Sequence, residues 1–148
     1  MKPFATGKLL YLEEVDDPFF SLKLMGDGYA IDLSEGEIRA PFDGEVSMVF
    51  PTGHALALVS KDNMEVLLHL GIDTIELEGR GFLTQVHEGQ SVTCGQLLSI
   101  MDLEYIQKNG KSTVALCLFT SGEKITILKP HQLVTSSSEH IIEIRKEK

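Results

Sequence analysis

Glycine-containing turn signals recur along this chain, and their spacing of about 8–12 residues constrains the fold more than any other feature. Examples are Asp43-Gly44, Thr52-Gly53, Glu88-Gly89 and Ser121-Gly122. Glycine and the short polar residues beside it favour tight turns. Short strands separated by such turns predict an all-β fold. We expect an antiparallel β-sandwich or barrel-sandwich hybrid with one or two very short helices.

The expected strands are short, rich in aliphatic residues and bounded by turn residues. They cover residues 7–15, 28–33, 37–42, 44–50, 55–60, 65–72, 84–89, 91–102, 112–119, 124–128 and 141–146. Gly89 and Gly95 predict two tight turns around a short strand, because glycine adopts positive φ without steric cost. A helix is expected at 101–110, with Asp102 as N-cap and Gly110 as the stop signal. A one-turn helix is expected near 16–23.

Length and composition indicate a single globular domain covering residues 1–148. Hydrophobic residues make up 43% and charged residues 24% of the chain, which is usual for such a domain. The sequence contains no apolar run of the ~20 residues that span a bilayer, and no signal-peptide core. We therefore expect a cytoplasmic protein without membrane insertion. Cys94 and Cys117 lie outside any CxxC pair and are predicted to be free thiols.

The formal net charge of −9 bears on the class of partner. It argues against nucleic acid, because phosphates require Lys and Arg. It is compatible with a basic protein partner, since complementary charge speeds encounter. By itself, the charge favours a role in solubility over a role in partner binding.

The apolar stretch VLLHLGIDT at 66–74 contains a histidine. Side chains of a strand alternate between its two faces. Alternation places one set on the core face, namely Val66, Leu68, Leu70 and Ile72. It places His69 on the opposite, half-exposed face, together with Glu65, Leu67 and Gly71. From this pattern alone, His69 could be a core histidine, a metal ligand or a nucleophile.

A second histidine, His54, precedes the expected strand at 55–60. The Asp62-Asn63 turn allows this strand to pair with 65–72, which would bring His54 close to His69. Two imidazoles could contribute to a zinc site, but zinc takes three or four ligands and no third has suitable spacing. They could act as general acid and base, or as nucleophile and hydrogen-bond donor. The remaining histidines are expected to have no chemical role: His87, His131 and His140.

A resemblance to a known family rests on four motifs that occur in the same order as in that family. They are MGDGYAID (25–32), APFDGEV (40–46), FPTGHA (50–55) and HLGIDTIELEGRGF (69–82). Together they resemble the glucose-type enzyme IIA component of the bacterial phosphoenolpyruvate:sugar phosphotransferase system. The resemblance implies a β-sandwich in which His69 takes a phosphoryl group from the phosphocarrier protein HPr. His69 then passes the group to a cysteine in the IIB domain of a sugar permease. His54 is implied to assist, and Thr52 is the family's nearby threonine.

The chemistry fits these residue types. Imidazole must be neutral to attack phosphorus, and a pKa of about 6.5 makes it largely neutral at cytoplasmic pH. An N–H of His54 can donate to a phosphoryl oxygen, and Thr52 can bind the other ring nitrogen and set the tautomer. No metal, nucleotide or other cofactor is required. No GxxxxGK[ST] motif is present, so ATP is not the expected donor.

The resemblance also implies a docking surface for HPr and IIB, with an apolar ring and an acidic rim. The candidate ring residues are Phe19, Phe20, Leu24, Met25, Phe50, Leu67 and Ile75. The candidate rim residues are Asp17, Asp73 and Glu76. For Phe50 and Leu24, ordinary core positions are equally compatible with the sequence, whereas Phe20 is expected at the interface.

The sequence also bears on two other functions. A zinc peptidase of the lysostaphin type needs an HxxxD pair and an HxH motif, and only the His69 to Asp73 spacing is present. A regulatory interaction module could control other permeases or kinases through its phosphorylation state, and in relatives the two histidines can join an intermolecular zinc site. A monomer is expected. The sequence names neither the sugar nor whether the chain is free-standing or part of a larger permease.

Overall fold

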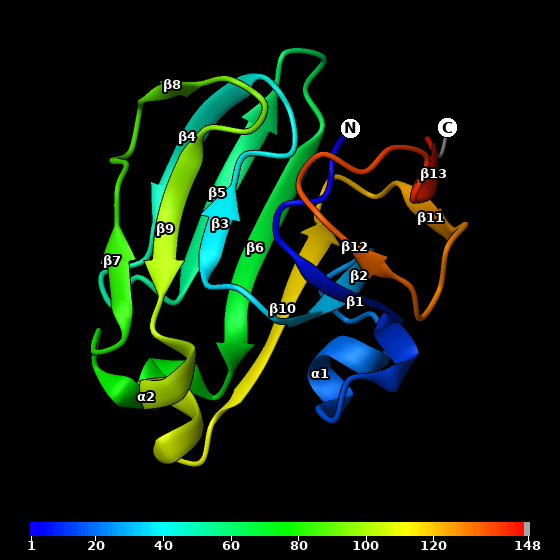
Figure 1. Cartoon of the computed structure of the whole chain (residues 1–148). Helices are drawn as coiled ribbons and strands as arrows, with labels where there is room; N and C mark the ends of the chain where they lie inside the picture. The colour runs from blue at the N-terminus through cyan, green and yellow to red at the C-terminus, as the bar shows by residue number, and fades with distance from the viewer. Residues whose placement is uncertain (147–148) are drawn as a thin grey trace.

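The computed structural model describes residues 1–146, and it is built almost entirely from antiparallel strands (Figure 1). The largest sheet has eight strands in the order β12-β1-β2-β10-β6-β5-β4-β8. Their bounds are β12 (Leu133–Val134), β1 (Gly7–Tyr11), β2 (Asp27–Leu33), β10 (Ser112–Phe119), β6 (Glu65–Ile72), β5 (Ala55–Ser60), β4 (Gly44–Val49) and β8 (Ser91–Val92). A three-stranded sheet contains β3 (Glu37–Arg39), β9 (Leu97–Met101) and β7 (Phe82–Thr84), and a two-stranded sheet pairs β11 (Lys124–Ile127) with β13 (Ile142–Arg145). The predicted all-β fold is confirmed.

Two short α-helices begin where the sequence predicted. In α1 (Pro18–Ser21), the Asp17 carboxylate accepts a hydrogen bond from the Phe19 amide at 3.0 Å. In α2 (Leu103–Lys108), the Asp102 carboxylate accepts from the Tyr105 amide at 3.1 Å. These caps satisfy amides that have no partner inside the helix. Two 3₁₀ turns, η1 (Leu12–Glu14) and η2 (Thr74–Leu77), were not predicted.

Most predicted strands are present, with some changes at their ends. Gly89 and Gly95 both have positive φ and flank β8, as expected. The predicted strand at 84–89 is wrong, because pairing with β9 falls on Phe82–Thr84 instead. The first predicted strand, 7–15, ends at Tyr11, where η1 begins. Strand β12 was missed because two residues leave no alternation pattern to detect.

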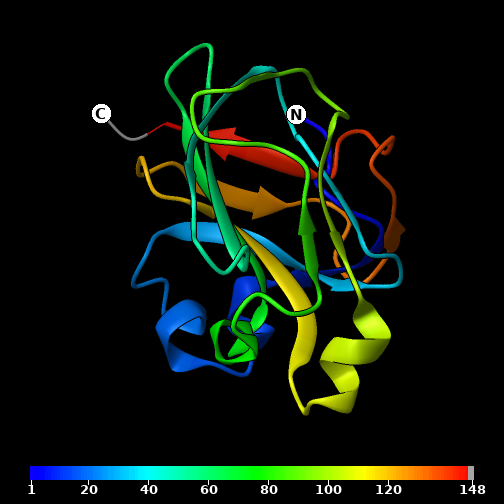
Figure 2. The same ribbon diagram turned by 90° about the vertical axis from the view of Figure 1, so that its left-hand side faces the viewer.

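The two faces of the large sheet carry different apolar clusters. One face packs against the small sheets and forms the main core, with members from β2, β5, β6, β9 and β10. The other face carries a smaller cluster, comprising Leu12, Val15, Phe20, Ala30, Ala55, Leu67, Ile72, Leu116 and Leu118. The segment that contains η1 and α1 covers this second face of the sheet. It lies beside the sheet at one end of the molecule (Figures 1 and 2).

Alternation in β6 holds as far as Leu70 and then fails. Leu68 and Leu70 belong to the main core, and Leu67 belongs to the smaller cluster. Ile72 was expected in the main core but packs in the smaller cluster. The reason is Gly71, whose φ of +92° breaks the regular strand, together with an irregular register opposite Ser112.

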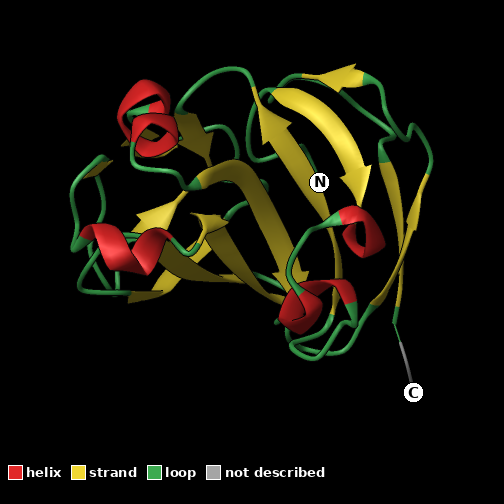
Figure 3. Ribbon diagram, turned by 90° about the horizontal axis from the view of Figure 1, so that it is seen from below, coloured by secondary structure: helices red, strands yellow, loops and turns green. Residues whose placement is uncertain are grey.

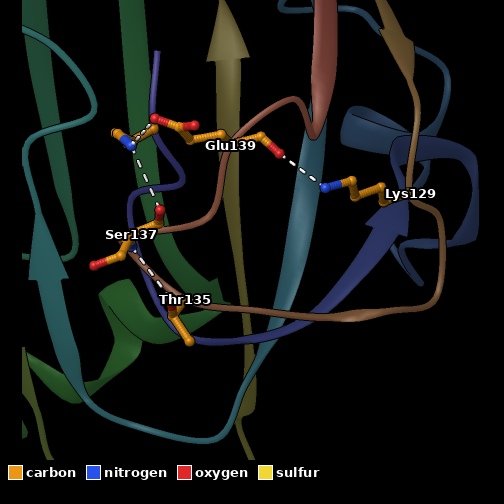
Figure 4. A network of polar contacts seen from close by, with 5 residues as sticks. Lys129, Thr135, Ser137 and Glu139 are labelled. Atoms are coloured by element: carbon orange, nitrogen blue, oxygen red, sulfur yellow. Dashed lines mark hydrogen bonds and ion pairs between the residues drawn. The ribbon is translucent and has the colours of Figure 1, made fainter.

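The segment after β12 is tied back to the rest of the chain by polar contacts (Figure 4). The Lys129 ammonium donates to the Glu139 carbonyl at 2.9 Å, and the Ser137 amide donates to the Thr135 hydroxyl at 3.2 Å. Lys2 reaches the Glu139 carboxylate at 2.8 Å. The N-terminal and C-terminal segments are thus joined to each other. In Figure 1 the N-terminus and β13 lie at the opposite end of the molecule from α1.

Candidate functional site

Strand pairing brings the two histidines together. In the β5–β6 ladder Ala55 lies opposite His69, and the Leu70 amide donates to the His54 carbonyl at 2.7 Å. The imidazole centroids of His54 and His69 are 5.3 Å apart. This arrangement was predicted from the turn at 62–63. Figure 3 views the end of the molecule at which the short helices gather and β6 ends.

His69 is held by a backbone carbonyl. Its Nδ1 lies 2.7 Å from the carbonyl oxygen of Gly71. A carbonyl can only accept, so Nδ1 must carry the proton and donate. The unprotonated nitrogen is then Nε2, which makes no hydrogen bond within residues 1–146. His69 therefore presents a nitrogen with a free lone pair.

His54 is held by a side chain instead. The Thr52 hydroxyl forms a short contact with Nδ1 of His54. The turn that carries both residues is closed by the Gly53 amide, which donates to the Phe50 carbonyl at 2.8 Å. When the hydroxyl donates to Nδ1, the proton of His54 lies on Nε2 and is available as a donor.

Aromatic rings flank both imidazoles. Phe20 lies against His69 with a centroid separation of 4.8 Å, and Phe50 lies edge-on to His54 at 5.3 Å. His54 is buried, with 5% of its surface exposed, and His69 is half-buried. The two histidines therefore lie in a largely apolar setting formed by the smaller cluster.

This setting keeps both histidines neutral. Burial lowers the pKa of His69, against the opposing effects of the Gly71 carbonyl and the Asp17 and Asp73 carboxylates. Burial also lowers the pKa of His54, and a proton gained by His69 would lower it further. Desolvation disfavours a charged imidazole, which explains the direction of both shifts. At neutral pH each ring thus keeps one unprotonated nitrogen.

The predicted apolar docking residues differ in exposure and fall into three groups. Phe19, Leu24 and Ile75 are exposed, whereas Met25 and Phe50 are half-buried. Phe20 and Leu67 are 6% and 8% exposed and belong to the smaller cluster. Both side chains are largely buried, because α1 folds Phe20 onto His69 and alternation turns Leu67 into the same cluster, and their part in partner docking stays a prediction.

The three predicted rim carboxylates have different local roles. Asp17 caps α1 and is half-buried. Asp73 is exposed and has left-handed backbone geometry, with φ of 60°. Glu76 is exposed and pairs with the Lys111 ammonium at 2.6 Å. Asp17 and Asp73 lie near enough to His69 to affect its pKa, and Glu76 follows Asp73 within η2.

The Gly71 carbonyl was missed as a functional group, because a backbone atom leaves no residue-type signal. A glycine two residues after a strand histidine was the available clue. Exposed Leu22, at the end of α1, was also not recognised as part of the apolar surface. Within residues 1–146 no group of three or more His, Cys, Asp or Glu side chains is placed to hold a metal ion. The histidine pair supplies only two ligands.

Cys94 and Cys117 are free thiols, as predicted. None of the helices in the described part of the chain is long and apolar enough to cross a membrane.

Comparison with known proteins identifies the family. The family described as "phosphoenolpyruvate-dependent sugar phosphotransferase system, EIIA 1" matches residues 1–125. The solved structure of glucose permease IIA from Mycoplasma capricolum is similar with 33% sequence identity and a TM-score of 0.80. That match covers 91% of this chain and 94% of the other. The chain therefore belongs to the glucose-type EIIA family of the phosphotransferase system, as the sequence motifs predicted, and it is a phosphocarrier component of sugar transport.

Proposed function

We propose that this protein is a cytoplasmic, monomeric phosphocarrier that accepts a phosphoryl group from phospho-HPr on Nε2 of His69. It then passes the group to a cysteine in the IIB domain of a sugar permease. The observation that supports this most is the hydrogen bond from Nδ1 of His69 to the Gly71 carbonyl, because it leaves Nε2 as the nucleophilic nitrogen. The proposal needs no metal or nucleotide.

Acceptance is a single displacement at phosphorus. The Nε2 lone pair of His69 forms the new N–P bond as the N–P bond of the donor histidine breaks, and its electron pair returns to the donor nitrogen. In the second step a cysteine thiolate attacks the phosphorus, and His69 leaves. Because Nδ1 has kept its proton throughout, His69 leaves as neutral imidazole.

His54 and Thr52 support the charge that arrives. A phosphoryl group brings anionic oxygens into an apolar setting, where a hydrogen bond is worth more than in water. The Nε2–H of His54 can donate to one of these oxygens, while the Thr52 hydroxyl keeps the proton on Nε2. Lowered pKa values favour the neutral form of both rings before transfer.

Docking would use the exposed apolar residues around the site and the carboxylates beside them. Phe19, Leu24 and Ile75 are exposed large side chains, which are typical of partner surfaces. Asp17, Asp73 and Glu76 could meet basic residues of HPr. Charge of this kind affects mainly the association rate.

The test is intact-protein mass spectrometry after incubation with phosphoenolpyruvate, enzyme I and HPr, with HPr omitted as the control. We expect one acid-labile phosphoryl group, dependent on HPr and mapped to His69. His69→Gln should give no labelling. His54→Gln should still accept the group, but transfer to IIB should slow by about 100-fold, as for loss of one charge-stabilising donor. Normal labelling of the His69 variant would remove the proposal.

A regulatory interaction is the second candidate, favoured by two neighbouring imidazoles whose Nε2 atoms make no hydrogen bond within residues 1–146. Zinc binding would require the His54 proton to move from Nε2 to Nδ1, where it would donate to the Thr52 hydroxyl. They could supply two ligands of a zinc ion shared with a partner protein, which would provide the others. Phosphorylation of His69 would remove one ligand, so binding would depend on the phosphorylation state. Isothermal titration of a candidate partner with and without zinc would test this, and zinc-independent binding would exclude the shared ion.

A further inference from the structure

Thr74 lies three residues after Gly71, whose carbonyl accepts the hydrogen bond from His69. The side chain of Thr74 is completely buried. Thr74 begins η2, which follows the turn at Asp73. Its hydroxyl donates a hydrogen bond to the carbonyl oxygen of Leu70 at 2.8 Å. This bond spans the residue whose carbonyl binds His69, so Thr74 is placed to influence that carbonyl.

The peptide geometry shows how this influence acts. The Leu70 carbonyl belongs to the peptide that enters Gly71, and the next carbonyl, that of Gly71, accepts from His69. Each peptide is planar, so fixing the Leu70 carbonyl also fixes the direction in which the chain enters Gly71. Only φ and ψ of Gly71 then remain to aim its carbonyl at Nδ1.

Glycine by itself would leave these dihedrals free, since it populates both signs of φ. Thr74 restricts them mainly through its hydroxyl, which fixes the peptide that enters Gly71, and its methyl group lies beside Gly71. A Cβ atom built on Gly71 would lie 2.5 Å from Cγ2 of Thr74 and 2.7 Å from the Ser112 carbonyl oxygen. The methyl therefore packs against Cα of Gly71, while the hydroxyl holds the preceding carbonyl.

The other side of Leu70 is also fixed. Its amide donates to the His54 carbonyl at 2.7 Å. Leu70 is thus bonded through its N–H to the strand of one histidine and through its carbonyl to Thr74. A loss at Thr74 would leave the second of these bonds open, immediately before Gly71.

We propose that Thr74 is a positioning residue that holds the Gly71 carbonyl against Nδ1 of His69, and so keeps Nε2 as the phosphoryl acceptor. Thr74 contacts no reacting atom and acts through the Leu70 and Gly71 peptides. The inference rests on the proposed function only for the role given to Nε2. The claim about the tautomer concerns the unphosphorylated protein and stands separately.

Thr74→Ser and Thr74→Ala provide a matched test, because both remove the methyl group and only the second removes the hydroxyl. The tautomer of His69 is read from its ring ¹⁵N chemical shifts by NMR at neutral pH. We expect Nδ1–H with unprotonated Nε2 in the unchanged protein and in Thr74→Ser. We expect a mixture of both tautomers in Thr74→Ala. The rate of acceptance from phospho-HPr should fall about tenfold in Thr74→Ala, the usual scale for loss of a supporting hydrogen bond, and Thr74→Ser should largely restore it.

Full retention of the Nδ1–H tautomer in folded Thr74→Ala would overturn the inference. Equal loss of the tautomer in both variants would also overturn it, because the hydroxyl would then make no difference. Thermal unfolding of both variants identifies samples that are folded, and Thr74→Ala leaves space without overpacking. If the unchanged protein shows the expected tautomer but takes no phosphoryl group, the proposed function fails and the role of Thr74 in setting the tautomer remains.

Discussion

The two faces of the central strands in the large sheet differ in how completely they are covered. On one face, Leu68 and Leu70 are fully buried among residues from the small sheets. On the other face, Leu67 and His69 are covered by one turn of helix and a 3₁₀ turn, and His69 stays half-buried. The same eight residues of β6 therefore build a sealed core and a partly open site.

One strand therefore contributes to stability through its core face and to chemistry through the face that carries His69. A period of two separates the side chains completely, so the open face can carry polar residues without disturbing the core. The thin cover is still enough to desolvate both imidazoles and lower their pKa values. The difference between the two faces can be tested by substitution and by acidification.

Neighbouring leucines on opposite faces provide the strongest test. Leu68→Ala should lower the free energy of unfolding by about 3–5 kcal/mol, the upper part of the range for buried leucine. Leu67→Ala should cost about 2 kcal/mol, because its surroundings can relax towards solvent. Urea denaturation followed by circular dichroism measures both. Equal losses would show that the two faces are equally well packed and would break the comparison.

The face assignment was largely predictable from the sequence, but the site details were not. Alternation placed His69 opposite Leu68, and the turn at 62–63 predicted its approach to His54. Periodicity could not show the irregularity at Gly71, which moves Ile72 to the other face. Thr74 and Ser112 surround Gly71 in the folded chain, and these contacts leave no signal in the local sequence pattern.

The burial of Phe20 could not be predicted from the sequence either. An apolar pair in a short helix, Phe19 and Phe20, shows that one side must pack, but not which strand it meets. The structure shows 50% exposure for Phe19 and 6% for Phe20. The predicted docking surface therefore included one residue that faces solvent and one that covers the histidine.

Removing the cover should raise the pKa of His69. Phe20→Ala opens the ring to water, and burial is the main cause of the lowered pKa. We expect the pKa to move towards its ordinary value of about 6.5. The loss of stability should be about 3 kcal/mol, the lower limit for buried phenylalanine. NMR titration of His69 measures the first effect and urea denaturation the second.

Phe19→Ala is the matched control, because Phe19 lies on the same helix and its ring is 5.7 Å from that of Phe20. It should leave both the His69 pKa and stability nearly unchanged, since its side chain is half exposed. If both variants shift the pKa equally, the cover over His69 is a property of the whole helix and not of Phe20.

Acidification should lower the free energy of unfolding through the two histidines on the partly open face of the sheet. Both histidines have lowered pKa values in the folded protein, so the unfolded chain binds more protons between the folded values and about 6.5. The unfolding free energy should be constant above about pH 6.5 and fall below it, by at most about 1.4 kcal/mol per pH unit for each histidine.

Urea denaturation from pH 7.5 to 5.5 measures this slope while carboxylates remain ionised. The double variant His54→Gln, His69→Gln removes both lowered pKa values and should largely abolish the slope. A variant on the core face, Leu68→Ala, should be less stable at every pH but should keep the slope. An unchanged slope in the double variant would mean that the pH dependence arises elsewhere.

The smallest expected effect separates the two ways in which the histidines are held. Thr52→Val keeps the shape of Thr52 and removes the hydroxyl that contacts His54, at a cost of about 1 kcal/mol or less. The ring ¹⁵N shifts of His54 should then show mixed tautomers, whereas His69 should keep its Nδ1 proton because a backbone carbonyl holds it. Acceptance on His69 should be unchanged and onward transfer to IIB slower, with Thr52→Ser close to the unchanged protein. A change in the His69 tautomer in Thr52→Val would show that the tautomers of the two rings are coupled. The Thr52 hydroxyl and the Gly71 carbonyl would then determine both tautomers jointly.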